Sequence, residues 1–113
     1  MRLLVNSNVM SKKGYSVKEH RDASDRLSIH FDQIAVRLYD KITQAIVERY
    51  ELKPVSEVTR GLDEKFQDFA KDNKVVGLEW DIWSGYIVTA KVPMADDLVR
   101  EIASFVSERY ENS

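Results

Sequence analysis

Residues 75–92 read VVGLEWDIWSGYIVTAKV, and apolar and polar side chains alternate on both sides of Ser84-Gly85. This alternation is typical of two strands that each bury one face and are joined by a tight turn. A change of register by one residue would move every side chain to the opposite face of the sheet. The length of the turn therefore decides which residues are buried, and this stretch constrains the fold more than any other.

A three-residue loop, Trp83-Ser84-Gly85, gives the more consistent hairpin. It pairs Trp80 with Val88 and makes one face wholly apolar, whereas a two-residue loop would place a lysine on the buried face. Three-residue hairpin loops usually end in a residue with positive φ, which glycine adopts without strain. The sequence predicts an antiparallel hairpin of about 75–83 and 86–92.

Helices are expected to cover the apolar face of this hairpin. Apolar residues recur at helical spacing in three segments, about 33–51, 57–72 and 95–110. Pro54 limits the first segment, and Asp96 and Asp97 place favourable negative charge in the first turn of the last one. The predicted fold class is α+β, with the hairpin packed against three helices.

Two strands alone are marginally stable in water, so the hairpin calls for a third strand. Leu3–Val5, Leu27–Phe31 or a strand of a partner chain could supply it. Residues 27–31 alternate strictly between apolar and polar, but they also continue the helical pattern that follows. Whether 25–31 is strand or helix is left open at this stage.

The length of 113 residues suits one domain. Residues 1–26 are polar, carry a net charge of +3 and are predicted to form a partly flexible N-terminal arm. Residues 27–113 carry a net charge of −5 and are predicted to form a single α+β domain. A mildly acidic body with a short basic arm makes a nucleic-acid partner unexpected.

The helix expected at 33–51 is apolar over more than one stripe. Tyr39 and Tyr50 belong to an arc of about 200°, whereas a helix that touches one layer needs about 100°. Either two layers of the same chain enclose this helix, or part of its surface faces a second protein. Both tyrosines are therefore candidate binding residues.

Trp83 is a second candidate contact residue, because a tryptophan at a hairpin tip has no place on the buried face. Tryptophan supplies a large contact area at low entropic cost in protein interfaces. It could instead fold back over the end of a helix. Ile87, on the outer face of the hairpin, also suggests partial cover there, so a dimer is a modest inference.

Glu79 and Asp81 lie two residues apart on one strand and project from its outer face, about 7 Å apart. That spacing falls within the range of the two carboxyl groups of inverting glycosidases. Lys91 lies diagonally within reach of Glu79 as an ordinary ion-pair partner. We favour a structural role for the two carboxylates, and retain them as candidate binding residues.

Other chemistry has little support in the sequence. The chain has no cysteine, and its two histidines, His20 and His30, lack a further ligand at a metal-binding spacing, so they are expected to be solvated surface residues. The glycines are scattered and form no phosphate loop. No catalytic residue, metal or cofactor is predicted, and an enzyme is not favoured.

These features predict a small, soluble, cytoplasmic protein-binding module that associates with itself or with another protein, such as an inhibitor of the immunity type or an adaptor subunit. No apolar run is long enough to span a membrane, so no membrane partner is expected. The alternative is a small-ligand-binding protein, or a minor hydrolase that uses Glu79 and Asp81.

Overall fold

A computed structural model describes residues 17–110. Seven strands form one antiparallel sheet in the order β1-β2-β7-β6-β5-β3, and β4 pairs with the other end of β5. The strands are β1 (Val17–Arg21), β2 (Leu27–Phe31), β3 (Lys53–Pro54), β4 (Thr59–Arg60), β5 (Glu64–Lys71), β6 (Lys74–Asp81) and β7 (Gly85–Ala90).

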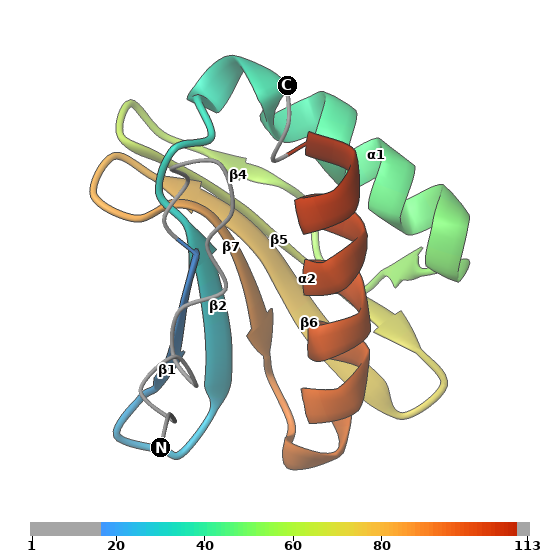
Figure 1. Ribbon diagram of the computed structural model, residues 1–113. Helices are drawn as coiled ribbons and strands as arrows, with labels where there is room; N and C mark the ends of the chain where they lie inside the picture. Colours follow the sequence, from blue (N-terminus) through green and yellow to red (C-terminus); the bar gives the residue numbers. More distant parts are fainter. Residues whose placement is uncertain (1–16, 111–113) are drawn as a thin grey trace.

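Two α-helices, α1 (Tyr39–Tyr50) and α2 (Asp96–Tyr110), pack on the same face of the sheet (Figure 1). Each follows a short 3-10 turn, η2 (Val36–Leu38) or η3 (Pro93–Ala95). The result is a two-layer α+β architecture: among the described residues both helices cover one sheet face, and no helix covers the other, which we call the open face. No helix in the described part of the chain is long and apolar enough to cross a membrane.

The core lies between the helices and the inner face of the sheet, where alternate residues of the central strands are apolar. Fully buried side chains come from β2, β6, β7, α1 and α2, and include Leu27, Ile29, Val76, Leu78, Val88, Ile42, Ile46, Val99 and Ile102. Burial of apolar surface of this kind contributes about 25 cal/mol per Å². The period-two pattern of the strands and the 3.6-residue pattern of the helices meet in this one layer.

The prediction of three helices is wrong, because residues 57–72 form no helix. Residues 59–60 are β4 and residues 64–71 are β5, which pairs along its whole length with β6. Val58, Leu62, Phe66 and Phe69 fit a helical spacing by coincidence. Pairing with the exposed edge of β6 satisfies a full row of backbone groups, and this gain overrides the weak local pattern.

The hairpin is present, but its register differs from the prediction by two residues. Trp80 pairs with Tyr86 instead of Val88, Asp81 pairs with Gly85, and the loop is Ile82-Trp83-Ser84. A shift of two residues keeps the other side chains of the strands on their predicted faces, but Ile82, predicted to pair with Tyr86 on the apolar face, lies in the loop and is exposed. The even-numbered residues of β6 and β7 therefore face the helices, as the alternation predicts.

Residues 27–31 form a strand, β2, which pairs with β7 and so extends the hairpin. Of the other segments considered for a third strand, Leu3–Val5 lies outside the described residues. Val17–Arg21, within the predicted arm, pairs with β2 as the edge strand β1.

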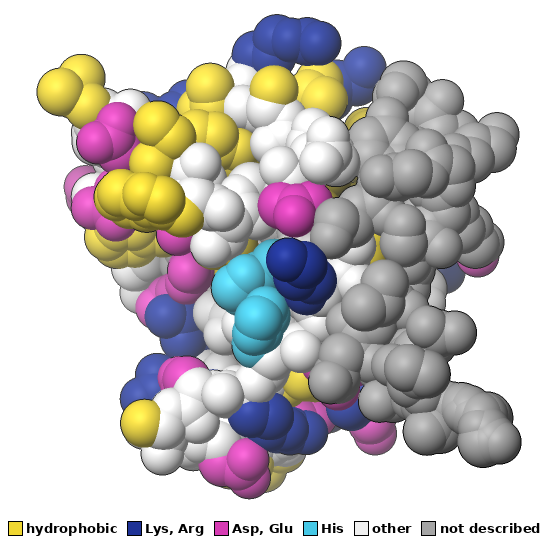
Figure 2. All heavy atoms as spheres, turned by 60° about the vertical axis from the view of Figure 1, so that its left-hand side comes forward, with side chains coloured by type: hydrophobic (Ala, Val, Ile, Leu, Met, Phe, Trp, Pro, Cys, Tyr) yellow, Lys and Arg dark blue, Asp and Glu magenta, His cyan; other side chains and the backbone are white. Residues whose placement is uncertain are grey.

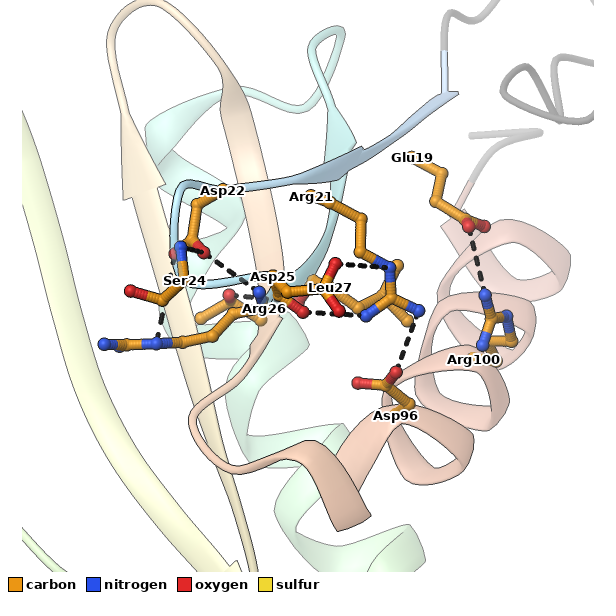
Figure 3. Close-up of polar contacts among 10 residues, drawn as sticks. Glu19, Arg21, Asp22, Ser24, Asp25, Arg26, Leu27, Asp96 and Arg100 are labelled. Carbon is orange, nitrogen blue, oxygen red and sulfur yellow. Dashed lines mark hydrogen bonds and ion pairs between the residues drawn. The ribbon is translucent and has the colours of Figure 1, made fainter.

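Ion pairs hold β1 against α2 (Figure 3). The guanidinium of Arg21 lies 2.9 Å from the carboxylate of Asp96, and Arg100 donates a hydrogen bond of 3.0 Å to Glu19. The turn between β1 and β2 is closed by Asp22, whose carboxylate accepts two backbone N–H bonds of 2.9 Å. The strand β1 is therefore tied to the helix layer at its middle and at its C-terminal end.

Other parts of the same chain bury Tyr39 and Tyr50, the two candidate residues in the wide apolar arc of α1. Tyr39 is buried against the sheet and its hydroxyl donates to the carbonyl of Leu78 at 2.6 Å. Tyr50 is buried against α2, where its hydroxyl donates to the carbonyl of Glu101 at 3.0 Å and its ring meets Phe105 edge-on. The helix α1 thus contacts both the sheet and the other helix of the same chain.

Candidate protein-contact surface

Two loops meet at one end of the sheet, where β4 turns into β5 and β6 turns into β7 (Figure 1). The backbone N–H of Ile82 donates to the carbonyl of Asp63 at 3.0 Å, which joins one loop to the other. Within the first loop, the N–H of Gly61 donates to the carbonyl of Glu64 at 2.8 Å. Both loops are therefore held by backbone hydrogen bonds.

Asp81 fixes the shape of the second loop. Its carboxylate oxygen accepts hydrogen bonds from the backbone N–H groups of Trp83 at 2.9 Å and Ser84 at 2.6 Å. An aspartate that bonds to the backbone two and three residues ahead is a common way to build a tight turn. The carboxylate is thus occupied with backbone donors and positions Trp83.

Gly85 lets this loop lie directly on the end of β2. Its φ of +72° belongs to the left-handed region, and a Cβ placed there would be 2.1 Å from the carbonyl oxygen of Phe31. Any side chain would collide with the backbone of the neighbouring strand. Glycine is therefore required at position 85 in the observed register.

Large apolar side chains on these loops and the adjoining strand are exposed. We call them the loop-end patch: Leu62 (fully exposed), Trp83 (80%), Ile82 (57%) and Phe66 (38%). Exposed apolar residues scattered singly need no explanation, whereas a contiguous group of them often marks a contact surface. Because both loops are pinned, a partner would meet a preformed surface and would bear little cost of ordering it.

Acidic residues flank the loop-end patch. Asp63 and Glu64 are both exposed and follow Leu62 directly, while Asp81 lies below Trp83. Figure 2 shows hydrophobic and acidic side chains side by side in the upper left part of the open face. Asp63 and Glu64 therefore place negative charge on one side of the patch.

Beyond the patch, the open face carries an ion-paired cluster. The ammonium of Lys91 lies 3.2 Å from the carboxylate of Glu79 and 3.8 Å from that of Asp68. These side chains cross above Gly77, where a Cβ would come within 2.9 Å of three neighbouring side chains. Burial raises the pKa of Glu79, and Lys91 opposes the rise.

The two histidines of the chain lie together in the middle of the open face (Figure 2). The ring centroids of His20 and His30 are 4.4 Å apart, and Nε2 of His30 is 2.8 Å from the hydroxyl of Ser28. A hollow of about 250 Å³ reaches from this pair to Trp83. The histidine pair is thus continuous with the loop-end patch.

The pKa of His30 is lowered, first by burial, then by the facing imidazole of His20 and weakly by Lys18; Asp81 and Asp32 oppose the effect. The unfolded chain therefore binds a proton more readily than the folded chain between this lowered pKa and about 6.5. In that window the free energy of unfolding rises with pH. The contribution of His30 to stability is lost progressively as the pH falls from about 6.5 through the lowered pKa.

Replacing His20 with glutamine is expected to raise the pKa of His30 part of the way toward its ordinary value, because burial remains as the larger cause. Titration of the imidazole C–H resonances by NMR measures this pKa directly. The matched variant Lys18→Gln should raise it less, since Lys18 acts more weakly. An unchanged pKa in His20→Gln would contradict the coupling between the two rings.

No protein-family model, curated protein or solved structure matches this chain. Its function is therefore inferred from the geometry and chemistry of its own surfaces. Within residues 17–110, no three His, Cys, Asp or Glu side chains come together in a way that could hold a metal ion.

The candidate residues taken from the sequence lie in three different places. Trp83 is in the loop-end patch, with Asp81 beneath it. Glu79 and Ile87 lie side by side on the open face, where Glu79 is ion-paired and 23% exposed and Ile87 is buried. Tyr39 and Tyr50 are in the core, with their hydroxyls bonded to backbone carbonyls, so neither side chain is available to a partner.

Sequence reasoning missed Leu62, Phe66 and the histidine pair. Leu62 and Phe66 were assigned to the buried face of a helix that does not exist. The strict alternation of Leu27–Phe31, read as a strand, would have placed His30 on the outer face. Only the pairing of β1 with β2 brings His20 beside it.

Proposed function

We propose that this protein is a small non-catalytic binding module, of the inhibitor, immunity-protein or adaptor kind, that contacts another protein through the loop-end patch. The observation that carries the proposal is the exposure of Leu62, Ile82 and Trp83 on two loops that are fixed by backbone and carboxylate hydrogen bonds. These side chains add nothing to the core.

The energetic reason is the apolar area that a partner would remove from water. Each buried Å² contributes about 25 cal/mol, and tryptophan is among the residues that dominate interface energetics. A standard interface buries about 800 Å² on each side, more than four side chains supply. The patch is therefore proposed as the centre of a larger contact that includes Asp63, Glu64 and part of the open face.

The acidic side of the patch favours a partner with basic groups. Asp63 and Glu64 would face those groups across the contact, which increases the association rate and disfavours acidic partners. A two-fold dimer built on this patch would bring the acidic residues of both copies into one interface. We therefore propose a different protein as the partner and treat self-association as an outcome to be tested.

The compartment proposed for this interaction is the cytoplasm. The cysteine-free sequence supports this, because disulfide-stabilised small domains are typical of oxidising compartments.

The test compares a variant inside the loop-end patch with a variant of an exposed apolar residue outside it. Partners captured by the immobilised protein are identified by mass spectrometry, purified and titrated by calorimetry. Trp83→Ala is expected to weaken binding by at least about tenfold, in line with a central interface tryptophan. Met94→Ala, which alters a 56% exposed side chain before α2, should leave the affinity unchanged.

Two outcomes would contradict the proposal. Equal affinity of Trp83→Ala and the unaltered protein for a purified partner would remove the patch from the interface. Light scattering that gives the mass of a dimer, reduced to a monomer by Trp83→Ala, would make a second copy of the chain the occupant of the patch. In either case a different basic protein would no longer be the proposed ligand of this surface.

A further inference from the structure

A second concave site lies away from the loop-end patch, where the start of α1 meets the end of α2 (Figure 1, top). The cavity has a volume of about 600 Å³, within the usual range of small-molecule sites. The segment before η2 forms one wall, and Arg109 and Tyr110 of α2 form the opposite one.

Three positively charged side chains from three elements line this cavity: Arg37 of η2, Lys41 of α1 and Arg109 of α2. No acidic residue among those described lines it. None of the ion pairs found between residues 17 and 110 involves these three side chains. The cavity therefore concentrates positive charge in a chain whose net charge is −2.

Local structure explains only one of the three charges. Arg109 is in the last turn of α2, where a cation is favourable, and its guanidinium lies 5.4 Å above the ring of Phe105. Arg37 and Lys41 are four residues apart at the start of a helical segment, a spacing at which like charges repel one another. An anion between them would turn this repulsion into attraction.

The wall that carries Arg37 is rigid. The indole N–H of Trp80 donates to the carbonyl of Ile34 at 2.9 Å, and the N–H of Ile34 donates to the carbonyl of Phe31 at 3.2 Å. Tyr110, on the opposite wall, is largely buried. The cavity is therefore supported by fixed backbone, which favours a preformed site.

We propose that this cavity binds a soluble small molecule bearing phosphate groups, held by Arg37, Lys41 and Arg109. Guanidinium groups match phosphate oxygens in a two-pronged geometry, and a lysine ammonium adds a point charge. Gln33 supplies an uncharged side-chain amide at the same wall for the remainder of the ligand. The site is separate from the loop-end patch, so this inference does not depend on the proposed function.

Pyrophosphate is the probe for this site, titrated by calorimetry and by NMR at an ionic strength held constant with sodium chloride. We expect saturable binding that shifts the amide resonances of residues 33–41 and 109–110. The double variant Arg37→Gln/Lys41→Gln should weaken it by at least about tenfold. Both side chains are exposed, so circular dichroism should be unchanged.

The matched control removes the same charge elsewhere. Lys53→Gln/Lys74→Gln alters two exposed lysines on β3 and β6 and should weaken binding by less than about twofold, because distant exposed charges are screened by salt. An equal loss in the two double variants would reduce the effect to general charge attraction and overturn the proposal. Absence of saturable pyrophosphate binding to the unaltered protein would also overturn it.

Discussion

Replacing Gly85 with alanine is expected to lower the free energy of unfolding by about 3 kcal/mol or more, a large part of the 5–15 kcal/mol typical of a domain. Two causes add. The φ of +72° is strained for alanine, and its Cβ would lie 2.1 Å from the carbonyl oxygen of Phe31, which is backbone and has little freedom to move. Urea denaturation followed by circular dichroism measures the loss.

Gly61→Ala is the matched control for this prediction. A Cβ at position 61 would meet its nearest neighbour, the side chain of Glu64, at 3.5 Å, which is ordinary contact. Its stability should therefore stay within about 0.5 kcal/mol of the unaltered protein. Similar losses in Gly85→Ala and Gly61→Ala would show that the approach of the loop to β2 is not as close as described.

The hydrogen bond between Thr43 and Tyr86 is expected to give the second large effect. The two hydroxyl oxygens are 2.6 Å apart, between α1 and β7, and both side chains are buried. Burial raises the pKa of Tyr86 well above its ordinary value, so this hydroxyl stays protonated. Thr43→Val leaves the Tyr86 hydroxyl enclosed without its partner, at an expected cost of about 2 kcal/mol.

A double-mutant cycle separates the energy of the hydrogen bond from the effects of changing each side chain alone. Tyr86→Phe should cost about 1–2 kcal/mol, and the double variant should cost clearly less than the sum of the two, because no buried hydroxyl is then left unpaired. Thr59→Val, on exposed β4, serves as the control and should change stability by less than about 0.5 kcal/mol. Additive losses would contradict a direct bond across the core.

The alternation around Ser84-Gly85 predicts the hairpin and the buried face of both its strands. It does not give the pairing, since registers that differ by two residues bury the same side chains. In the observed register, Asp81 bonds to two loop N–H groups and Gly85 closely approaches Phe31. Neither contact leaves a signal in the apolar pattern.

At residues 57–72, long-range strand pairing overrides the local helical pattern of apolar residues. The segment EKFQDFAK places Phe66 and Phe69 three residues apart, a spacing that suits a helix better than a strand. The eight residue pairs between β5 and β6 decide the outcome. By contrast, the apolar spacing and the acidic first turn of 95–110 predict α2 correctly, because that helix buries one stripe on the sheet.

The candidate surface is predicted only in part by the sequence. Trp83 stands out because the hairpin gives it no buried place, and its exposure agrees with that reasoning. Leu62 joins it only because β5 returns the preceding loop to the same end of the sheet. Likewise, His20 and His30 are ten residues apart in sequence and become neighbours through the pairing of β1 with β2.

The sequence by itself determined most of the residues that avoid water: the apolar even-numbered side chains of β6 and β7, the stripe of α2 and the apolar arc of α1. These follow from periodicity, a local property that burial imposes on every strand and helix. Only the tertiary structure decided what those faces meet, because strand pairing and layer packing join segments that are distant in the chain. The same long-range contacts expose Leu62 and Trp83 together and bring Arg37, Lys41 and Arg109 around one cavity.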